Sequence, residues 1–99
     1  MLTGKQRSYL KSLANPLKPV IQLGKEGITP AFISQVDETI ESHELVKISI
    51  LESCDLTAKE AAQIVAERTQ SEFVQCIGRK FVIYRRNKEK PTIELPRVK

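Results

Sequence analysis

The stretch LKPVIQLGKEGITPAF, residues 17–32, joins a short apolar run to a helix start through a turn bracketed by two glycines. The apolar run, residues 20–23, has the length and composition of a short buried strand. Thr29 and Pro30 are the residue types preferred at the N-cap and at the first position of a helix. A strand, a G-x-x-G turn and a helix therefore follow one another directly, which indicates an α/β fold.

Capping boxes predict two further helices, one on each side of this unit. Thr3 followed by Gln6 opens the first, and Asn15 ends it because a residue that precedes proline disfavours the helical conformation. Thr57 followed by Glu60 opens the last helix. The helix that begins at Thr29 lies between them in the chain.

Alternating apolar residues predict the remaining strands. In residues 45–51, LVKISIL, apolar and polar positions alternate as in a half-buried strand. Two apolar runs, residues 71–77 and 80–86, flank Gly78 and Arg79, a pair that suits a tight hairpin with glycine at the first central position. The element order is α-β-α-β-α-β-β. Because strand–helix–strand units favour parallel pairing and a hairpin is antiparallel, we expect a mixed four-stranded sheet packed by helices, with its strand order left open.

The size and composition fit one globular domain. The chain has 99 residues, of which 40% are hydrophobic and 28% are charged. We expect the domain to occupy residues 1–96 and residues 97–99 to form a flexible tail. The sequence contains neither an apolar run of about 18 residues nor the apolar core of a signal peptide. A cytoplasmic monomer without a membrane partner is the expectation.

Catalysis and metal binding find little support in the sequence. Cys54 and Cys76 are widely separated and His43 is the single histidine, so the spacing of a zinc site is lacking. No nucleophile–base pair stands out either. We therefore expect neither an enzyme nor a bound metal or cofactor.

Charge is distributed unevenly along the chain. The net charge is +4, yet residues 1–25 carry five basic side chains and no acidic one, and residues 26–72 carry ten acidic and three basic ones. Residues 73–99 are basic again, with eight basic and two acidic side chains. Basic ends and an acidic middle can fold into a two-faced molecule whose basic face attracts polyanions. A solvated mixture of charges is the alternative.

The turn Gly24-Lys25-Glu26-Gly27 is the most specific candidate site. A G-x-x-G turn that feeds a helix leaves backbone N–H groups free at the helix N-terminus, where the helix dipole favours an anion. Lys25 adds a positive charge, whereas Glu26 opposes an anion pocket. Simple chain connection is the competing explanation, because glycine-bracketed turns are common.

Basic side chains elsewhere would complete a surface for nucleic acid if they shared a face with this turn. Tyr9 and Tyr84 are candidates to stack on unpaired bases, or else core residues with their hydroxyl groups at the rim. The candidate electrostatic contacts to RNA, besides Lys25, are Lys5, Arg7, Lys11, Lys18, Arg79, Lys80, Arg85 and Arg86.

Three separated motifs carry a resemblance to a known family. LKPVIQLGKEGIT, ESHELVKISIL and CIGRKFVIYRR, in this order, resemble the CRM domain family (chloroplast RNA splicing and ribosome maturation). The sequence is most similar to its bacterial single-domain members, the YhbY-like RNA-binding proteins. The resemblance covers residues 2–95, nearly the whole chain.

The resemblance implies a fold similar to the C-terminal domain of a bacterial translation initiation factor. It also implies RNA binding through the loop from Gly24 to Gly27 and a neighbouring basic surface, association with precursors of the large ribosomal subunit, and no catalysis. The alternative is a protein-interaction module, in which the acidic helix (Asp37, Glu38, Glu41, Glu44) docks a ribosomal or other basic protein.

Overall fold

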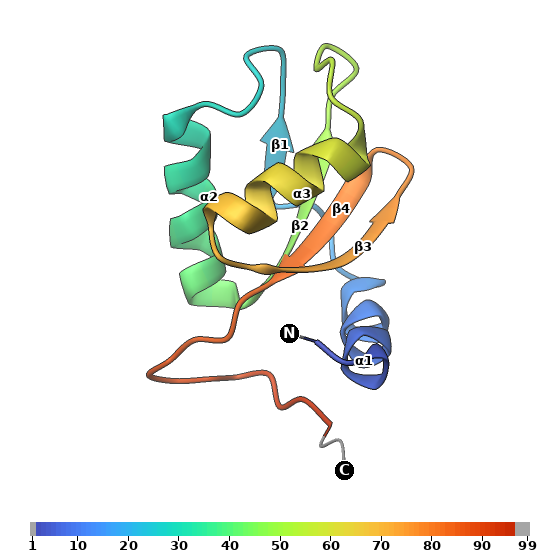
Figure 1. Cartoon of the computed structure of the whole chain (residues 1–99), viewed down its shortest axis with the longest axis vertical. Helices are drawn as coiled ribbons and strands as arrows, with labels where there is room; N and C mark the ends of the chain where they lie inside the picture. The colour runs from blue at the N-terminus through green and yellow to red at the C-terminus, as the bar shows by residue number, and fades with distance from the viewer. Residues whose placement is uncertain (1, 97–99) are drawn as a thin grey trace.

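The computed structural model describes residues 2–96 and confirms the predicted element order (Figure 1). Met1 and the predicted tail, residues 97–99, lie outside the described part. The elements are α1 (Gly4–Ala14), β1 (Ile21–Leu23), α2 (Pro30–His43), β2 (Leu45–Ile50), α3 (Ala58–Arg68), β3 (Glu72–Ile77) and β4 (Lys80–Tyr84).

The predicted helix caps are all present. The Thr3 and Thr57 side chains each accept a hydrogen bond from the backbone three residues on, and both capping boxes close reciprocally. Thr29 caps α2 with Pro30 in its first turn. Each cap satisfies N–H groups that the helix itself leaves without partners. The local sequence therefore fixes where the three helices start.

The four strands form one mixed sheet in the order β1-β2-β4-β3. β1 and β2 are parallel, as the crossover through α2 requires, and β4 runs antiparallel to both of its neighbours. Gly78, with φ of 60°, occupies the first central position of the β3–β4 turn, as predicted. β1 is shorter than the strand predicted over residues 20–23, because Val20 precedes β1 and is 56% exposed.

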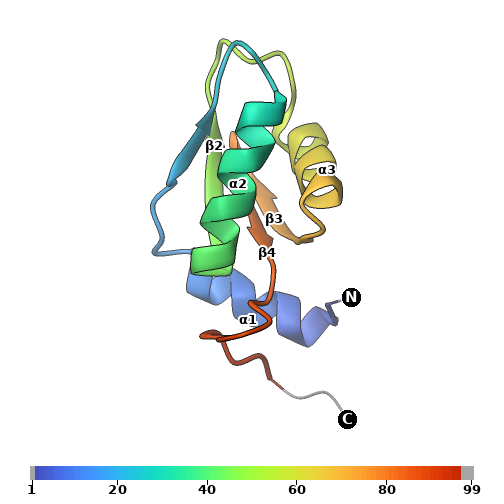
Figure 2. The same ribbon diagram turned by 90° about the vertical axis from the view of Figure 1, so that its left-hand side faces the viewer.

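Each face of the sheet carries its own apolar core. α2 and α3 cover one face, where Leu23, Ile48 and Phe81 are fully buried (Figures 1 and 2). On the opposite face, Leu10 of α1 packs with Val82 and with partly buried residues of the C-terminal segment. Figure 2 shows α1 and that segment at one end of the molecule, so α1 covers only part of its face.

Glu44 holds the C-terminal segment, the residues after β4, against the end of α2 by hydrogen bonds. This residue is 1% exposed and has φ of 62°. Its carboxylate accepts hydrogen bonds from the backbone N–H groups of Asn87 (2.9 Å), Thr92 (2.6 Å) and Ile93 (2.9 Å), and from the Thr92 hydroxyl. Burial raises the pKa of this carboxyl, but these hydrogen bonds outweigh burial and lower its pKa below the ordinary value.

Candidate nucleic-acid interface

Three chain segments meet at the end of the sheet where β1 and β2 finish. The N–H of Leu51 donates to the carbonyl of Leu23 at 2.9 Å, and the N–H of Ile50 donates to the carbonyl of Arg79 at 2.7 Å. The glycine turn, the end of β2 and the hairpin turn are therefore neighbours. In Figures 1 and 2 the glycine turn lies at the opposite end of the molecule from α1.

The glycine turn is exposed and keeps donors available. The N–H of Gly27 is used inside the turn, where it donates to the carbonyl of Gly24 at 3.0 Å. Within residues 2–96, no hydrogen bond engages the backbone N–H groups of Lys25 or Glu26. A shallow hollow of about 460 Å³ lies between this turn and the first turns of α2. Such free amides beside a helix N-terminus suit an anion.

The fold requires glycine at only one of the two glycine positions of the turn. Gly27 has φ of 72°, a conformation that strains other residues, so its role is structural. Gly24 has no such constraint, and a Cβ added there would meet only Leu51 Cδ1 at an ordinary 3.5 Å. The fold itself therefore tolerates a side chain at position 24. A bare backbone at this position is what close approach by a ligand would need.

The part of the α1-side sheet face that α1 leaves uncovered borders this turn, and we call it the open sheet face. The register places Gln22, Ser49, Lys80 and Ile77 in one row across all four strands. Lys47 and Gln75 belong to the next row, on either side of buried Val82. The open sheet face consists of Gln22, Lys47, Ser49, Gln75, Ile77 and Lys80.

Some of the predicted cations gather around this region. Lys25 on the glycine turn and Lys80 at the start of β4 are exposed, and both lie at the same end of the sheet. Arg79 lies between them, but its side chain is engaged within the protein, because its Nε donates to the carbonyl of Ile50 at the end of β2 at 3.0 Å. Lys11 in the last turn of α1 and Lys18 before β1 are exposed, and Lys18 follows Leu17, whose carbonyl accepts a hydrogen bond from Lys47.

Other predicted cations lie elsewhere. Lys5 and Arg7 are near the start of α1, where the Arg7 Nε donates to the carbonyl of Phe73 at 3.3 Å. Arg86 follows the end of β4, which is the opposite end of the sheet from the glycine turn. The condition that these basic side chains share a face with the turn is therefore met only in part. Only part of the set surrounds the turn.

Comparison with known proteins identifies the family. The model of the CRS1/YhbY (CRM) domain matches residues 2–85. The chain belongs to the CRM domain family. It is 41% identical to the probable RNA-binding protein YqeI of Bacillus subtilis, over 97% of this chain and 100% of that one. It is 33% identical to an RNA-binding protein of Haemophilus influenzae, over 97% of this chain and 96% of that one.

A solved structure agrees with the fold of this CRM domain. The solution structure of the hypothetical protein SAV1595 of Staphylococcus aureus, proposed to bind RNA, is 49% identical and superposes with a TM-score of 0.82. The match covers 97% of this chain and 100% of that one. The predicted α/β class and the resemblance to the family are thus both confirmed.

The acidic helix of this CRM domain is largely occupied by internal contacts. The Arg85 guanidinium pairs with Asp37 at 2.6 Å and with Glu41 at 2.9 Å, and also donates to the Thr69 carbonyl at 2.8 Å. Arg85 therefore lies on the α2 side of the sheet. Its side chain links the end of β4 to α2 and to the C-cap residue of α3. Of the four acidic residues proposed to dock a basic protein, Glu44 is buried and two others hold Arg85. Glu38 is exposed and outside these contacts, and the Asp37 and Glu41 side chains stay 57% and 59% exposed, so α2 keeps an acidic surface smaller than the one predicted.

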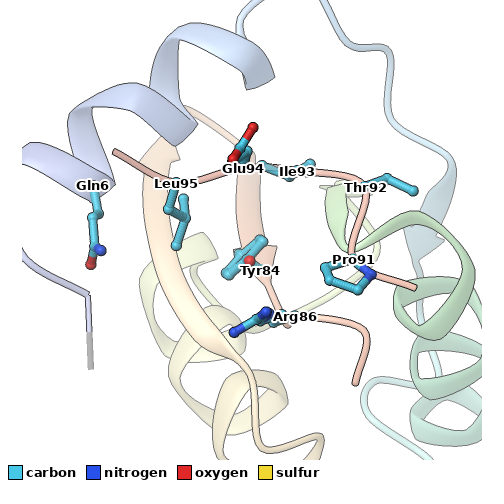
Figure 3. A pocket seen from close by; sticks show the side chains of 8 residues that line it. All are labelled: Gln6, Tyr84, Arg86, Pro91, Thr92, Ile93, Glu94 and Leu95. Atoms are coloured by element: carbon cyan, nitrogen blue, oxygen red, sulfur yellow. The ribbon is translucent and has the colours of Figure 1, made fainter. Parts of the chain in front are cut away.

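Tyr84 belongs to the interior and offers no stacking plane. It is 3% exposed, and within residues 2–96 its hydroxyl has no hydrogen-bond partner. Burial, together with the nearby Glu44 carboxylate, raises its pKa, and Arg86 acts in the opposite direction. Figure 3 shows the hollow of about 590 Å³ beside it, between the C-terminal segment and Gln6 of α1. This hollow lies away from the glycine turn. Tyr9 is 38% exposed and remains accessible.

Sequence reasoning missed the open sheet face as part of the candidate interface. The sequence predicts Lys47 and Gln75 only as strand residues and places Gln22 in the run before the turn. Alternation predicted that Lys47 and Ser49 share the polar side of β2. The extent of α1 over that side could not be predicted from periodicity, because it depends on the strand order.

Charge separates between the two sides of this domain. α1 carries three basic and no acidic residues, whereas α2 carries three acidic residues and neither lysine nor arginine.

Residues 2–96 hold no cluster of three His, Cys, Asp or Glu side chains that could ligate a metal. In the same part of the chain, every helix is too short or too polar to cross a membrane.

Proposed function

We propose that this CRM-family protein binds RNA through the glycine turn and the open sheet face. The amides of the turn would hold the sugar–phosphate backbone, with Lys25 as a mobile counter-charge. The observation that carries this proposal is the position of the turn, which is exposed, keeps amides free and borders a lysine-bearing sheet face. Two relatives named for RNA binding, similar over nearly their whole length, support it.

The surface chemistry favours a polyanion. Lys80 belongs to the open sheet face, Lys11 lies on α1 on the same side of the sheet, and Lys18 lies just before β1; within residues 2–96 none of their ammonium groups forms an ion pair. Lys47 Nζ donates to the Leu17 carbonyl at 2.9 Å, which keeps its charge on this side of the sheet. Phosphate contacts supply most of the sequence-independent affinity for nucleic acid. The acidic α2 covers the other face and would repel the same ligand.

We further propose that the RNA belongs to precursors of the large ribosomal subunit and that the protein acts as a monomer in the cytoplasm. This step rests on the resemblance to the stand-alone bacterial members of the family. Neither the turn nor the lysines would select one RNA over another, because phosphate contacts carry little sequence information. Selection would come from RNA shape or from exposed bases.

Ultraviolet crosslinking in cells, followed by sequencing of the bound RNA, tests the identity of the target. We expect fragments of large-subunit ribosomal RNA to be enriched, with precursor sequences among them. A variant with Lys25→Glu and Lys80→Glu is the control, and it should recover far less of the same RNA. Enrichment of messenger or transfer RNA in place of ribosomal RNA would contradict the proposed target.

A further inference from the structure

A hollow of about 380 Å³ lies on the open sheet face beside the hairpin turn. Buried Val82 forms its floor, and the side chain of Ile77, which is 64% exposed, forms part of its wall. The remaining lining is polar and contains no acidic side chain. The residues that matter for its chemistry are Asn15, Lys47, Gln75, Ile77, Lys80 and Val82.

Two side-chain amides at this hollow are available for hydrogen bonding. Asn15 follows α1, and Gln75 comes from β3. Within residues 2–96, neither side chain forms a hydrogen bond with another group. Each amide offers a donor and an acceptor side by side, which is the pattern that the edge of a nucleobase presents in return.

The residues around the hollow favour a ligand that carries a neutral ring on a charged backbone. A small free anion would gain nothing from the apolar floor at Val82 and Ile77. A free apolar ligand would gain nothing from Lys47 and Lys80 on either side. A nucleobase uses both features, because apolar side chains can pack on its faces while flanking phosphates meet the lysines.

The hollow also lies within reach of the glycine turn. The turn follows β1, and the hollow lies over β4 and β3, two and three strands away in the sheet. Neighbouring strands are about 4.8 Å apart, so the separation across the sheet is roughly 10–15 Å. G-x-x-G loops of the KH type clamp about four nucleotides of backbone, a span that covers this distance.

We propose that this hollow binds a single unpaired nucleobase of the RNA whose backbone the glycine turn holds. The inference rests on the proposed function and adds to it a source of selection, since the amides of Asn15 and Gln75 read the edge of one base. It predicts that single-stranded or looped RNA binds better than a continuous duplex, in which every base is stacked and paired.

The test compares two ligands with the same number of phosphates, a short oligouridine and an abasic ribose–phosphate oligomer of equal length. We expect the wild-type protein to bind oligouridine about tenfold more tightly at low salt, because each packed base contributes on this scale. The variant Gln75→Ala/Ile77→Ala should bind both ligands equally. Gln63→Ala/Ile64→Ala on α3 removes the same residue types from the other face and should keep the wild-type preference.

The possible outcomes separate the hollow from the proposed function. If the wild-type protein binds both ligands equally, and binding still weakens steeply with salt, the base site is wrong while backbone binding stands. If it binds neither ligand, both proposals fail. Should the double variant fail to fold, Ile77→Thr keeps a β-branched residue in β3 and must still reduce the preference several-fold. An unchanged preference in that folded variant would overturn the proposal.

Discussion

Replacing Glu44 by Gln is expected to destabilise this CRM domain by about 3 kcal/mol. The carboxylate accepts three backbone N–H groups and one hydroxyl, and an amide at this position turns one acceptor into a donor. At least one partly buried N–H then lacks a partner, and the charge-assisted bonds are lost. A domain of this size should lose roughly 12–24 °C in Tm. Thermal unfolding followed by circular dichroism measures the change.

A matched control lies on α2, the helix that Glu44 follows. Glu38 is exposed, and Glu38→Gln should change stability by less than about 0.5 kcal/mol. Because Glu44 holds the segment after β4, trypsin should cleave after Lys88 faster in the Glu44→Gln variant. Equal Tm values for the two variants would show that the Glu44 contacts contribute nothing to stability.

The same carboxylate makes stability depend on pH in a defined direction. Its folded-state pKa is lowered from the ordinary value of 4.5, so its contribution is complete above that value. As the pH falls from 4.5 through the lowered pKa, the contribution is lost. The difference in unfolding free energy between wild type and Glu44→Gln should therefore narrow below pH 4.5 and stay constant above pH 6. A difference that does not change with pH would contradict this account.

Reversing the charge of Lys25 and Lys80 together is expected to weaken RNA binding about 10–100-fold at low salt. A unit-charge pair at contact distance in water is worth about 1 kcal/mol, so losing the attraction at both positions costs about 2 kcal/mol, which corresponds to roughly 30-fold. Both side chains are exposed, so stability should change little. Fluorescence anisotropy with a labelled single-stranded RNA gives the dissociation constants.

The salt dependence shows whether the loss comes from phosphate contacts. Removing two such contacts from a single strand should reduce the slope of log K against log salt by about 1.4. The control Lys59→Glu/Arg68→Glu changes the net charge equally but lies on α3, on the other side of the sheet. If this control loses as much affinity as the test variant, net charge rather than location determines binding.

Much of this fold could be predicted because its signals are local. The capping boxes at Thr3 and Thr57 and the Thr29-Pro30 pair each depend on residues within one helical turn. The hairpin at Gly78 depends on a two-residue turn. Each of these signals stands in a short segment, so the element order follows from the sequence.

The less predictable features depend on contacts between distant segments. No local pattern in the sequence indicates that β4 lies between β2 and β3 in the sheet. Arg85 stands in a basic run, yet it binds Asp37 and Glu41, 48 and 44 positions away. Glu44 stands in an acidic run, yet it is buried by a segment more than 40 positions later. Charge patterns along the chain could not distinguish a charged side chain on the surface from one that forms ion pairs or hydrogen bonds within the protein.

The residues of the glycine turn are enough to predict a candidate site, and the structure leaves Lys25 and Glu26 exposed with their backbone N–H groups free within residues 2–96. RNA binding at this turn stays a prediction. The sequence could not assign the surroundings of the turn, because they come from four strands in a non-sequential order. Lys47 and Gln75 join Lys80 on one surface only through that order. The candidate interface is thus partly a local motif and partly a product of topology.

An NMR titration of the ¹⁵N-labelled protein with a short single-stranded RNA tests the central claim most directly. Binding at the glycine turn and the open sheet face should shift the amide signals of residues 24–27, 47–49 and 75–82. The signals of the exposed side of α2 and α3 should stay in place. Shifts concentrated on α2 and α3, with the signals of Lys25, Gln75 and Lys80 unchanged, would contradict the account.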